Sequence, residues 1–270
     1  MKVVVTMTSW KGRINHVPFA FYRFLTTQTV KPDFIYLWLS IDEFPNKEDD
    51  LPEDLINICN AFRIEIKWIK SNEYCFKRWY TCLDHYSDIV ISIDDDVYYD
   101  KTLIARSIDY ASRYTKCVIN VGSPIYKPLS FSNGIKRILK SIEADIPLYN
   151  MQLCGQCIFL PNTFPLEIVN ESETCKLRRI YCKKCDECGI TPLLVKHHIP
   201  IITHRWDNKI DKAMQVNAVS NDMRHIKDLQ LYLSIRLFPG CMDAWKSLYP
   251  GYNTTHYDNI PVDKILESLR

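Results

Sequence analysis

The sequence predicts an α/β fold in which a mostly parallel central sheet is flanked by helices. Within residues 3–121, short apolar runs of strand length alternate with amphipathic segments of helix length, and the connections are short. The run at 89–93 leads directly into three consecutive aspartates, Asp94, Asp95 and Asp96. Open α/β sheets bind ligands at the carboxyl ends of their strands, so the sequence indicates the fold class and a candidate site together.

Five strands and four helices are expected in this first part of the chain. The third strand alternates apolar with charged residues, which indicates a half-exposed strand near an edge. The strands are the apolar runs at Val3–Met7, Phe34–Leu39, Ile64–Trp68, Ile89–Ile93 and Cys117–Val121. The helices are indicated by four apolar stripes: Val17, Phe21, Phe24, Leu25 and Gln28; Leu55, Ile58, Cys59 and Phe62, after Pro52 as first helical residue; Cys75, Trp79, Cys82, Leu83 and Tyr86; and Ile104, Ile108 and Ala111, after Asp100 as N-cap.

The regular alternation ends after Gly122. A turn at Cys154-Gly155-Gln156 is expected to enter a strand, and Asn221-Asp222 is expected to cap a long helix. Residues 262–269 have the spacing of a last amphipathic helix. There is no internal repeat or low-complexity segment, so we expect residues 1–270 to form a single domain.

Composition narrows the class of protein. The chain has 270 residues, of which 47% are hydrophobic, and a net charge of +2. This balance argues against a nucleic-acid binder held by bulk electrostatics. No apolar stretch approaches the length of a membrane span, and the N-terminal apolar run is too short for a signal peptide. We therefore expect a cytosolic protein in which the eleven cysteines, an odd number, are reduced thiols.

The acidic triplet has the chemistry of a metal site. Side chains alternate along an extended backbone, so Asp94 and Asp96 are expected on one side and Asp95 on the other. Two convergent carboxylates suit a hard divalent cation that also holds phosphate oxygens. The alternative is an acidic turn after a strand, although such turns usually contain Gly, Asn or Pro and this one does not.

Four motifs in order resemble a known family. They are Thr-x-Thr-Ser-Trp-x-Gly-Arg at 6–13, Ser-x-x-Glu-Phe-Pro at 40–45, a Lys-Arg pair at 77–78, and Asp-Asp-Asp-x-x-Tyr at 94–99. Together they resemble bacterial sugar-nucleotide glycosyltransferases of the GT-A type, in the group that builds surface polysaccharides. The resemblance is best over residues 3 to 100.

The resemblance implies a single Rossmann-like GT-A domain, with residues 1–121 as the nucleotide-sugar-binding half and 122–270 as the acceptor-side half. It implies a glycosyltransferase of the hexosyltransferase type that uses Mn²⁺ or Mg²⁺. The partners would be a nucleotide-sugar donor and a glycan or lipid-linked oligosaccharide acceptor, with no nucleic acid. A lipid-linked acceptor would bring the protein into peripheral contact with the inner face of the membrane.

The resemblance also assigns roles around the donor. Asp96 would bind the metal directly, Asp94 would reach the metal or the ribose, and Asp95 would hold neighbouring backbone or the sugar. A late histidine completes the metal shell in many relatives, and His204 is the candidate, with His197 and His198 as rivals. Thr8, Ser9 and Arg13 would line the nucleotide pocket; the alternative is that they only form an ordinary turn. Lys77 and Arg78 would supply positive charge for phosphate or for pairing with aspartate; the alternative is that they lie on an exposed helix surface.

The acceptor hydroxyl needs a base, and a positioned carboxylate is the usual one. Asp186 and Glu187 match the acidic pair that serves as base in inverting relatives, with Asp186 as the first choice. The alternative is a solvated acidic pair in a charged segment.

The cysteine-rich segment allows two interpretations. Cys182, Cys185 and Cys188 are three residues apart, and Cys154 and Cys157 form a second pair, so zinc binding is one interpretation. The same spacing places the three on one helix face as small apolar core residues, which we favour. Two other functions remain: a zinc-stabilised binding module, and a nucleotidyltransferase, which needs a Gly-rich loop after the first strand that the Thr8–Gly12 turn does not provide.

Overall fold

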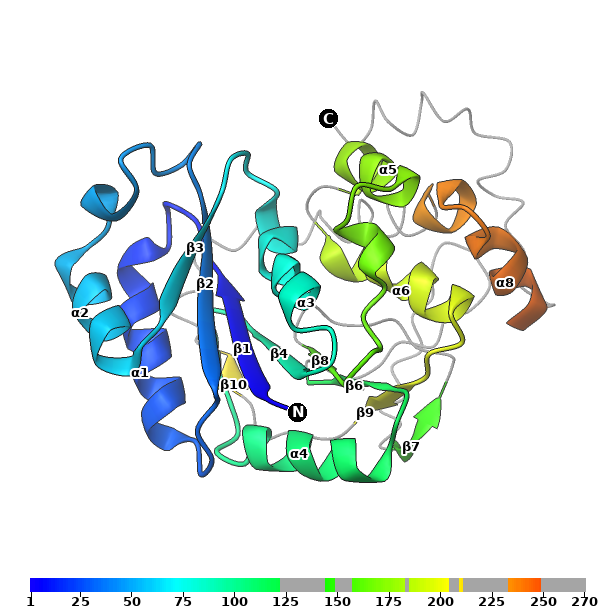
Figure 1. Cartoon of the computed structure of the whole chain (residues 1–270), viewed down its shortest axis with the longest axis horizontal. Helices are drawn as coiled ribbons and strands as arrows, with labels where there is room; N and C mark the ends of the chain where they lie inside the picture. Colours follow the sequence, from blue (N-terminus) through cyan, green and yellow to red (C-terminus); the bar gives the residue numbers. More distant parts are fainter. Residues whose placement is uncertain (122–143, 149–156, 183–184, 204–208, 211–232, 249–270) are drawn as a thin grey trace.

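The computed structural model of the chain (Figure 1) describes residues 1–121, 144–148, 157–182, 185–203, 209–210 and 233–248. Within these ranges, no helix combines the length and the apolar character needed to cross a bilayer. The expected turn at residues 154–156, the cap at Asn221-Asp222 and the helix at 262–269 lie outside the described residues.

The described strands form an eight-stranded mixed sheet and a separate two-stranded ribbon. The large sheet contains β1 (Val3–Thr8), β2 (Phe34–Ser40), β3 (Glu65–Ile69), β4 (Ile89–Ile93), β6 (Val118–Asn120), β7 (Ala144–Leu148), β8 (Cys157–Phe159) and β9 (Ile201–Thr203), and the ribbon contains β5 (Val97–Tyr98) and β10 (Lys209–Ile210). The order is β3-β2-β1-β4-β8-β6-β9-β7. The pairs β1–β2, β2–β3, β1–β4 and β6–β9 are parallel, whereas β8 is antiparallel to β4 and β6, and β7 to β9. The predicted α/β class with a mostly parallel sheet is confirmed, and the antiparallel strands come from the second half.

The helices pack on both faces of the sheet (Figure 1). The α-helices are α1 (Val17–Thr27), α2 (Glu53–Phe62), α3 (Thr81–Asp84), α4 (Leu103–Arg113), α5 (Glu173–Tyr181), α6 (Asp186–Lys196) and α8 (Cys241–Leu248). Short 3₁₀ helices are η1 (Ile14–His16), η2 (Lys47–Asp50), η3 (Tyr74–Tyr80) and η5 (Leu166–Ile168).

The alternation of side chains along the strands divides the core into two clusters. Val3, Val5 and Met7 of β1 belong to the cluster under α1, α2 and α4, whereas Val4 belongs to the cluster under η3, α5, α6 and α8. Every position of β4 is buried, as expected for a central strand covered on both faces. The half-exposed strand β3 is at the edge of the sheet, as the sequence predicts.

Three details of the predicted helices differ. Leu83 and Tyr86 are exposed because a 3₁₀ helix and the short α3 replace the expected helix: the change of period moves Leu83 off the buried face, and Tyr86 lies beyond the end of α3. The N-cap of α4 is Thr102, not Asp100, although Asp100 Oδ1 accepts a hydrogen bond from the Thr102 N–H (2.7 Å). Pro52 is the N-cap residue of α2, one position earlier than expected.

The order of the strands creates a switch point at β1. The chain passes from β1 to β2 and β3 on one side, and β4 then pairs with the other side of β1. Connections that leave in opposite directions open a crevice at the carboxyl ends of the strands, where doubly wound sheets bind ligands. Here that crevice lies beyond Thr8 of β1 and Ile93 of β4.

Candidate active site

The acidic triplet and the turn after β1 meet in this crevice. Ser9 Oγ donates to Asp95 Oδ2 (2.5 Å), and Arg13 Nη1 donates to Asp95 Oδ1 (2.8 Å) and lies 3.1 Å from Asp96 Oδ2. Burial acts to lower the pKa of Arg13, but the charges and hydrogen bonds of Asp95 and Asp96 outweigh it, and the pKa is raised. Within the described part of the chain, the buried Arg13 Nε has no acceptor.

The side chains of the triplet do not alternate as expected. Asp95 does not point away from the site, because the chain turns at Asp95 and Asp96 instead of continuing as a strand. Asp94 is fixed separately: its N–H donates to the Tyr99 hydroxyl (2.7 Å), and its Oδ1 accepts from Arg78. The pKa of Asp96 is raised by burial first and then by the charge of Asp94, so these two carboxylates repel one another.

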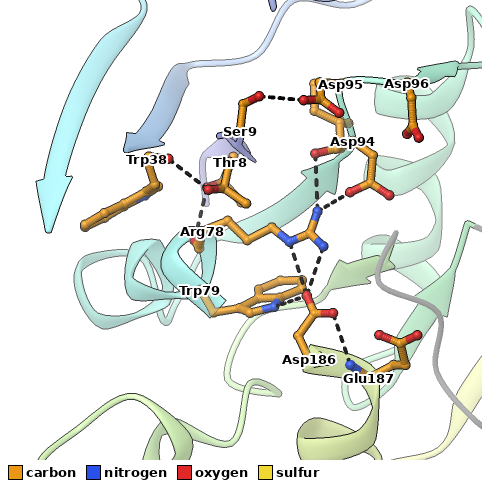
Figure 2. A network of polar contacts seen from close by, with 12 residues as sticks. Thr8, Ser9, Trp38, Arg78, Trp79, Asp94, Asp95, Asp96, Asp186 and Glu187 are labelled. Atoms are coloured by element: carbon orange, nitrogen blue, oxygen red, sulfur yellow. Dashed lines mark hydrogen bonds and ion pairs between the residues drawn. The ribbon is translucent and has the colours of Figure 1, made fainter. Parts of the chain in front are cut away.

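Arg78 connects the triplet to the second half of the chain (Figure 2). The side chain is 4% exposed, and its Nε and Nη2 donate to Asp186 Oδ2 at 3.2 and 2.9 Å. Trp79 Nε1 donates to the same oxygen at 2.7 Å. Burial raises the pKa of Asp186; the charge of Arg78 opposes this, and that of Glu187 adds to it. Asp186 is therefore an enclosed partner of Arg78, whereas Glu187 beside it is partly exposed.

Lys77 holds the turn after β1 through a hydrogen bond to its backbone. The side chain is 1% exposed, and its Nζ donates to the Ser9 carbonyl, Glu43 Oε2 and Asn72 Oδ1, each at 3.2 Å. Burial lowers the pKa of Lys77, and Glu43 opposes this shift. The alternative of an exposed helix surface is wrong for both Lys77 and Arg78, because η3 packs under the sheet and encloses them.

The remaining candidates lie in different places. Thr8 Oγ1 donates to the Trp38 carbonyl (2.9 Å), so it ties β1 to β2. His197 Nε2 lies 2.8 Å from Glu167 Oε2, at the far end of α6 from Asp186. His204 lies outside the described residues. Within the described ranges, no group of three or more His, Cys, Asp or Glu side chains is arranged to hold a metal.

The three clustered cysteines are core residues, but they do not share a helix. Cys182 ends α5, Cys185 precedes α6 and Cys188 lies inside α6, and each is at most 1% exposed. The prediction of one helix face is wrong because α5 ends at Tyr181 and a separate helix, α6, begins at Asp186. All three belong to the cluster of apolar side chains under α5 and α6.

Four residues with polar roles at the site were not singled out in the sequence. Two of them occupied motif positions, because Glu43 belongs to the Ser-x-x-Glu-Phe-Pro loop and Tyr99 ends the Asp-Asp-Asp-x-x-Tyr run. No sequence motif pointed to the polar roles of Trp79 and Asn72. Trp79 donates to a residue more than a hundred positions away, and Asn72 is a loop residue outside the motifs. The contacts of all four are with Lys77, Asp94 or Asp186.

Comparison with solved structures gives distant likenesses. S. aureus TarS 1-349 in complex with UDP has a TM-score of 0.49 and 10% identity, over 98% of this chain and 77% of that one. The same protein with UDP-GlcNAc gives 0.48 and 11%, over the same shares. A 4-diphosphocytidyl-2C-methyl-D-erythritol synthase gives 0.42 and 12%, over 86% of this chain and 100% of that one. No family model and no curated protein matches the chain. Because these TM-scores are below 0.5, the functional argument rests on the residues of the site.

Proposed function

We propose that the chain is a metal-dependent glycosyltransferase that moves a sugar from a nucleotide-sugar donor to a glycan or lipid-linked acceptor. The observation that carries the proposal is the set of carboxylates at the switch point, Asp94 to Asp96, with Arg13 and Lys77 around the adjoining turn. A nucleoside diphosphate needs positive charge and a metal at such a crevice. The carboxylates would hold the metal and Arg13 would supply positive charge, and hydrogen bonds hold these side chains.

The residues present fit a divalent cation. Asp94 and Asp96 repel one another, and a cation bound by both carboxylates would relieve that repulsion. Mg²⁺ typically takes only one or two protein carboxylates and completes its shell with phosphate oxygens and water, so two aspartates suffice. Bound Mn²⁺ or Mg²⁺ would stabilise the negative charge that develops on the leaving diphosphate.

The side chains of the site would then hold the donor. The Arg13 guanidinium is partly exposed beside Asp95 and Asp96, so it would supply positive charge to a diphosphate oxygen. Asp95 holds that guanidinium in place, and Lys77 holds the Ser9 carbonyl and thereby the turn. The donor side of the site is therefore largely preorganised.

For the acceptor side we assign the base to Glu187 and a positioning role to Asp186. A base must be within hydrogen-bond reach of the acceptor hydroxyl. Asp186 Oδ2 already accepts from Arg78 and Trp79, and only 2% of the residue is exposed, whereas Glu187 is partly exposed. Direct displacement with Glu187 as base would invert the configuration at the anomeric carbon.

The test measures nucleotide binding with and without metal. Nucleoside diphosphates (UDP, GDP, CDP, ADP) are screened by thermal shift with and without MnCl₂, and at least one should raise the melting temperature only with Mn²⁺. Asp96→Asn should lose this Mn²⁺-dependent shift. Asp109→Asn, on the exposed surface of α4, is the matched control and should retain it. An Asp96→Asn protein that keeps the metal-dependent shift would contradict the assignment.

A product assay separates the proposal from the nucleotidyltransferase alternative. A glycosyltransferase releases a nucleoside diphosphate from the donor, whereas a nucleotidyltransferase releases pyrophosphate from a nucleoside triphosphate. Pyrophosphate release from a triphosphate and a sugar phosphate, with no diphosphate release from any nucleotide-sugar, would replace the proposed function. Co-sedimentation with anionic vesicles tests the membrane contact that a lipid-linked acceptor implies.

A further inference from the structure

A hollow separate from the acidic triplet lies between the edge strand β3, η3 and α5. Its volume is about 740 Å³, within the range of pockets that bind small ligands. The aromatic side chains along it come from β2 and η3 and are Trp38, Tyr74 and Tyr80; Trp68 of β3 also borders it, but its ring packs with Phe44 in the cluster on the opposite face of the sheet. None of the residues proposed to hold the donor lines this hollow.

The aromatic rings are held in fixed orientations. Trp38 Nε1 donates to Thr81 Oγ1 (2.7 Å), and the Tyr80 hydroxyl donates to Glu73 Oε2 (3.0 Å). The Trp38 and Tyr80 rings are tilted by 38° with centroids 5.8 Å apart. Because these polar atoms are already bonded within the protein, the rings offer mainly their apolar surfaces to a ligand.

Tyr74 is held at the rim in an uncommon backbone conformation. Its φ is +51°, in the left-handed region that bulky residues rarely adopt, and its N–H donates to Asn72 Oδ1 (2.9 Å). The residue is 40% exposed. Backbone strain of this kind clusters at active sites and at sites that bind ligands.

The hollow has a surplus of positive charge. Its lining includes Lys70, Arg178, Arg179 and one carboxylate, Glu73, so three cations exceed one anion by two charges. Arg178 is 1% exposed and pairs with Glu73 (2.6 Å), which neutralises that carboxylate. Lys70 is exposed, and Arg179 is 37% exposed. Arg179 also pairs with Glu73 and lies 3.5 Å from Glu171. Because Glu171 is 80% exposed, solvent screens its charge. Lys70 and Arg179 can therefore face an anion.

The side chain of Lys77 connects the hollow to the candidate active site. Asn72 lines the hollow, and its Oδ1 accepts from Lys77 Nζ, which also donates to the Ser9 carbonyl in the turn of the donor site. The far wall is formed by α5, which belongs to the half of the chain assigned to the acceptor. One end of the hollow is therefore connected through Lys77 to the turn of the donor site.

We propose that this hollow binds an anionic stretch of the acceptor glycan, with sugar rings against the aromatic side chains and carboxylate or phosphate groups toward Lys70 and Arg179. The inference rests on the proposed function, which supplies an acceptor. The apolar C–H face of a pyranose suits a fixed aromatic surface, and the anionic substituents suit the two accessible cations. In this proposal the triplet binds the donor, and the hollow selects an acceptor that carries negative charge.

The experiment uses two matched tetrasaccharides and the full chain. Hyaluronan tetrasaccharide carries carboxylates, and chitotetraose is its neutral counterpart; binding is measured by isothermal titration calorimetry. The hyaluronan fragment should bind about tenfold more tightly at low salt, and the difference should shrink in 0.5 M NaCl, because two accessible charges contribute about 1–2 kcal/mol in total. No detectable binding of the anionic fragment, or equal affinities at low salt, would overturn the proposal.

The variants locate the binding. Lys70→Ala and Tyr74→Gly should each weaken hyaluronan binding by about fivefold. Glycine suits the positive φ at position 74, so the variant removes the ring without cost to the fold. Lys101→Ala and Tyr22→Ala, at exposed positions outside the hollow, should bind as wild type.

The nucleotide serves as the second ligand in the same proteins. Affinity for the nucleoside diphosphate with Mn²⁺ should be unchanged in Lys70→Ala and Tyr74→Gly. If these variants lose nucleotide affinity instead of hyaluronan affinity, the hollow belongs to the donor and the inference is wrong. If wild type binds the oligosaccharide in the hollow but no nucleoside diphosphate, the proposed function fails while the anionic-glycan site stands.

Discussion

Replacing Asp186 by asparagine separates a positioning role from a catalytic one. The change keeps the size of the side chain but removes its charge. In the wild type, Asp186 Oδ2 accepts from Arg78 Nε (3.2 Å), Arg78 Nη2 (2.9 Å) and Trp79 Nε1 (2.7 Å). Arg78 is 4% exposed, so in the variant its charge would be left with Asp94 as its carboxylate partner.

The expected cost follows from these contacts. Removing one partner of a buried ion pair costs about 3–5 kcal/mol, and asparagine retains one neutral acceptor, so we expect a loss of about 3 kcal/mol. For a chain of this size, 1 kcal/mol corresponds to about 2–4 °C, which gives a melting temperature about 6–12 °C lower. Affinity for nucleoside diphosphate with Mn²⁺ should fall as well, because Arg78 no longer fixes Asp94.

Glu187→Gln is the matched variant at the neighbouring position. Glu187 is partly exposed, so its melting temperature should stay within about 2 °C of wild type, since such surface changes cost about 0.5 kcal/mol or less. Its turnover should fall about 10²–10⁴-fold with nucleotide affinity retained, as expected for loss of a general base. Differential scanning fluorimetry, titration calorimetry and release of nucleoside diphosphate measure the three quantities. An Asp186→Asn protein with the wild-type melting temperature and nucleotide affinity but no turnover would refute the reasoning and make Asp186 the base.

Three further predictions concern stability and reactivity. Burial acts to raise the pKa of Glu167, but hydrogen bonds and charges from His197 and Lys196 outweigh it and lower the pKa. The ionised Glu167 therefore stabilises the fold above the ordinary glutamate pKa, and this stabilisation is lost as the pH falls through the pKa of the folded state. Glu167→Gln should melt about 2–4 °C below wild type at pH 6, a loss of about 1 kcal/mol, and the gap should close below about pH 4; a gap independent of pH would contradict this. Tyr99→Phe should cost about 1–3 kcal/mol by urea unfolding, because the Asp94 N–H loses its acceptor, and wild-type stability would show that the bond contributes little. Three buried thiols should react with Ellman's reagent at pH 8 only after guanidinium is added, and mass spectrometry of native labelled protein would disprove this if it found them modified. They are Cys59, Cys117 and Cys241, whose pKa values burial raises to about 11, 12 and 12.

Much of the first half of the fold could be predicted because its signals are local. The apolar run before Asp94 has strand length and no polar interruption, and the structure places it at the centre of the sheet. The alternation of Glu65 to Trp68 marked an edge strand, because only one face of such a strand is covered. The position of the triplet followed from the same reasoning, since a strand end can be located without knowing what packs around it.

The arrangement inside the site could not be predicted in the same way. For Lys77 and Arg78, an exposed helix surface stayed open as the alternative to a charged role at the site, because no sequence pattern indicates a 3₁₀ helix that packs under the sheet. The partner of Arg78, Asp186, is 108 positions away in the chain, so only the tertiary structure brings the two together. The turn at Asp95 was missed for a related reason: the contacts that bend the chain come from Ser9 and Arg13, on another strand end.

The buried guanidinium of Arg78 has a thermodynamic consequence. It joins Asp94 in the first half of the chain to Asp186 at the start of α6 in the second, with almost no solvent between them. The position of α6 and the occupancy of the acidic triplet by a ligand are therefore thermodynamically coupled. A ligand that favours one position of α6 must change affinity at the triplet by a certain factor, and occupancy of the triplet must change the affinity of that ligand by the same factor.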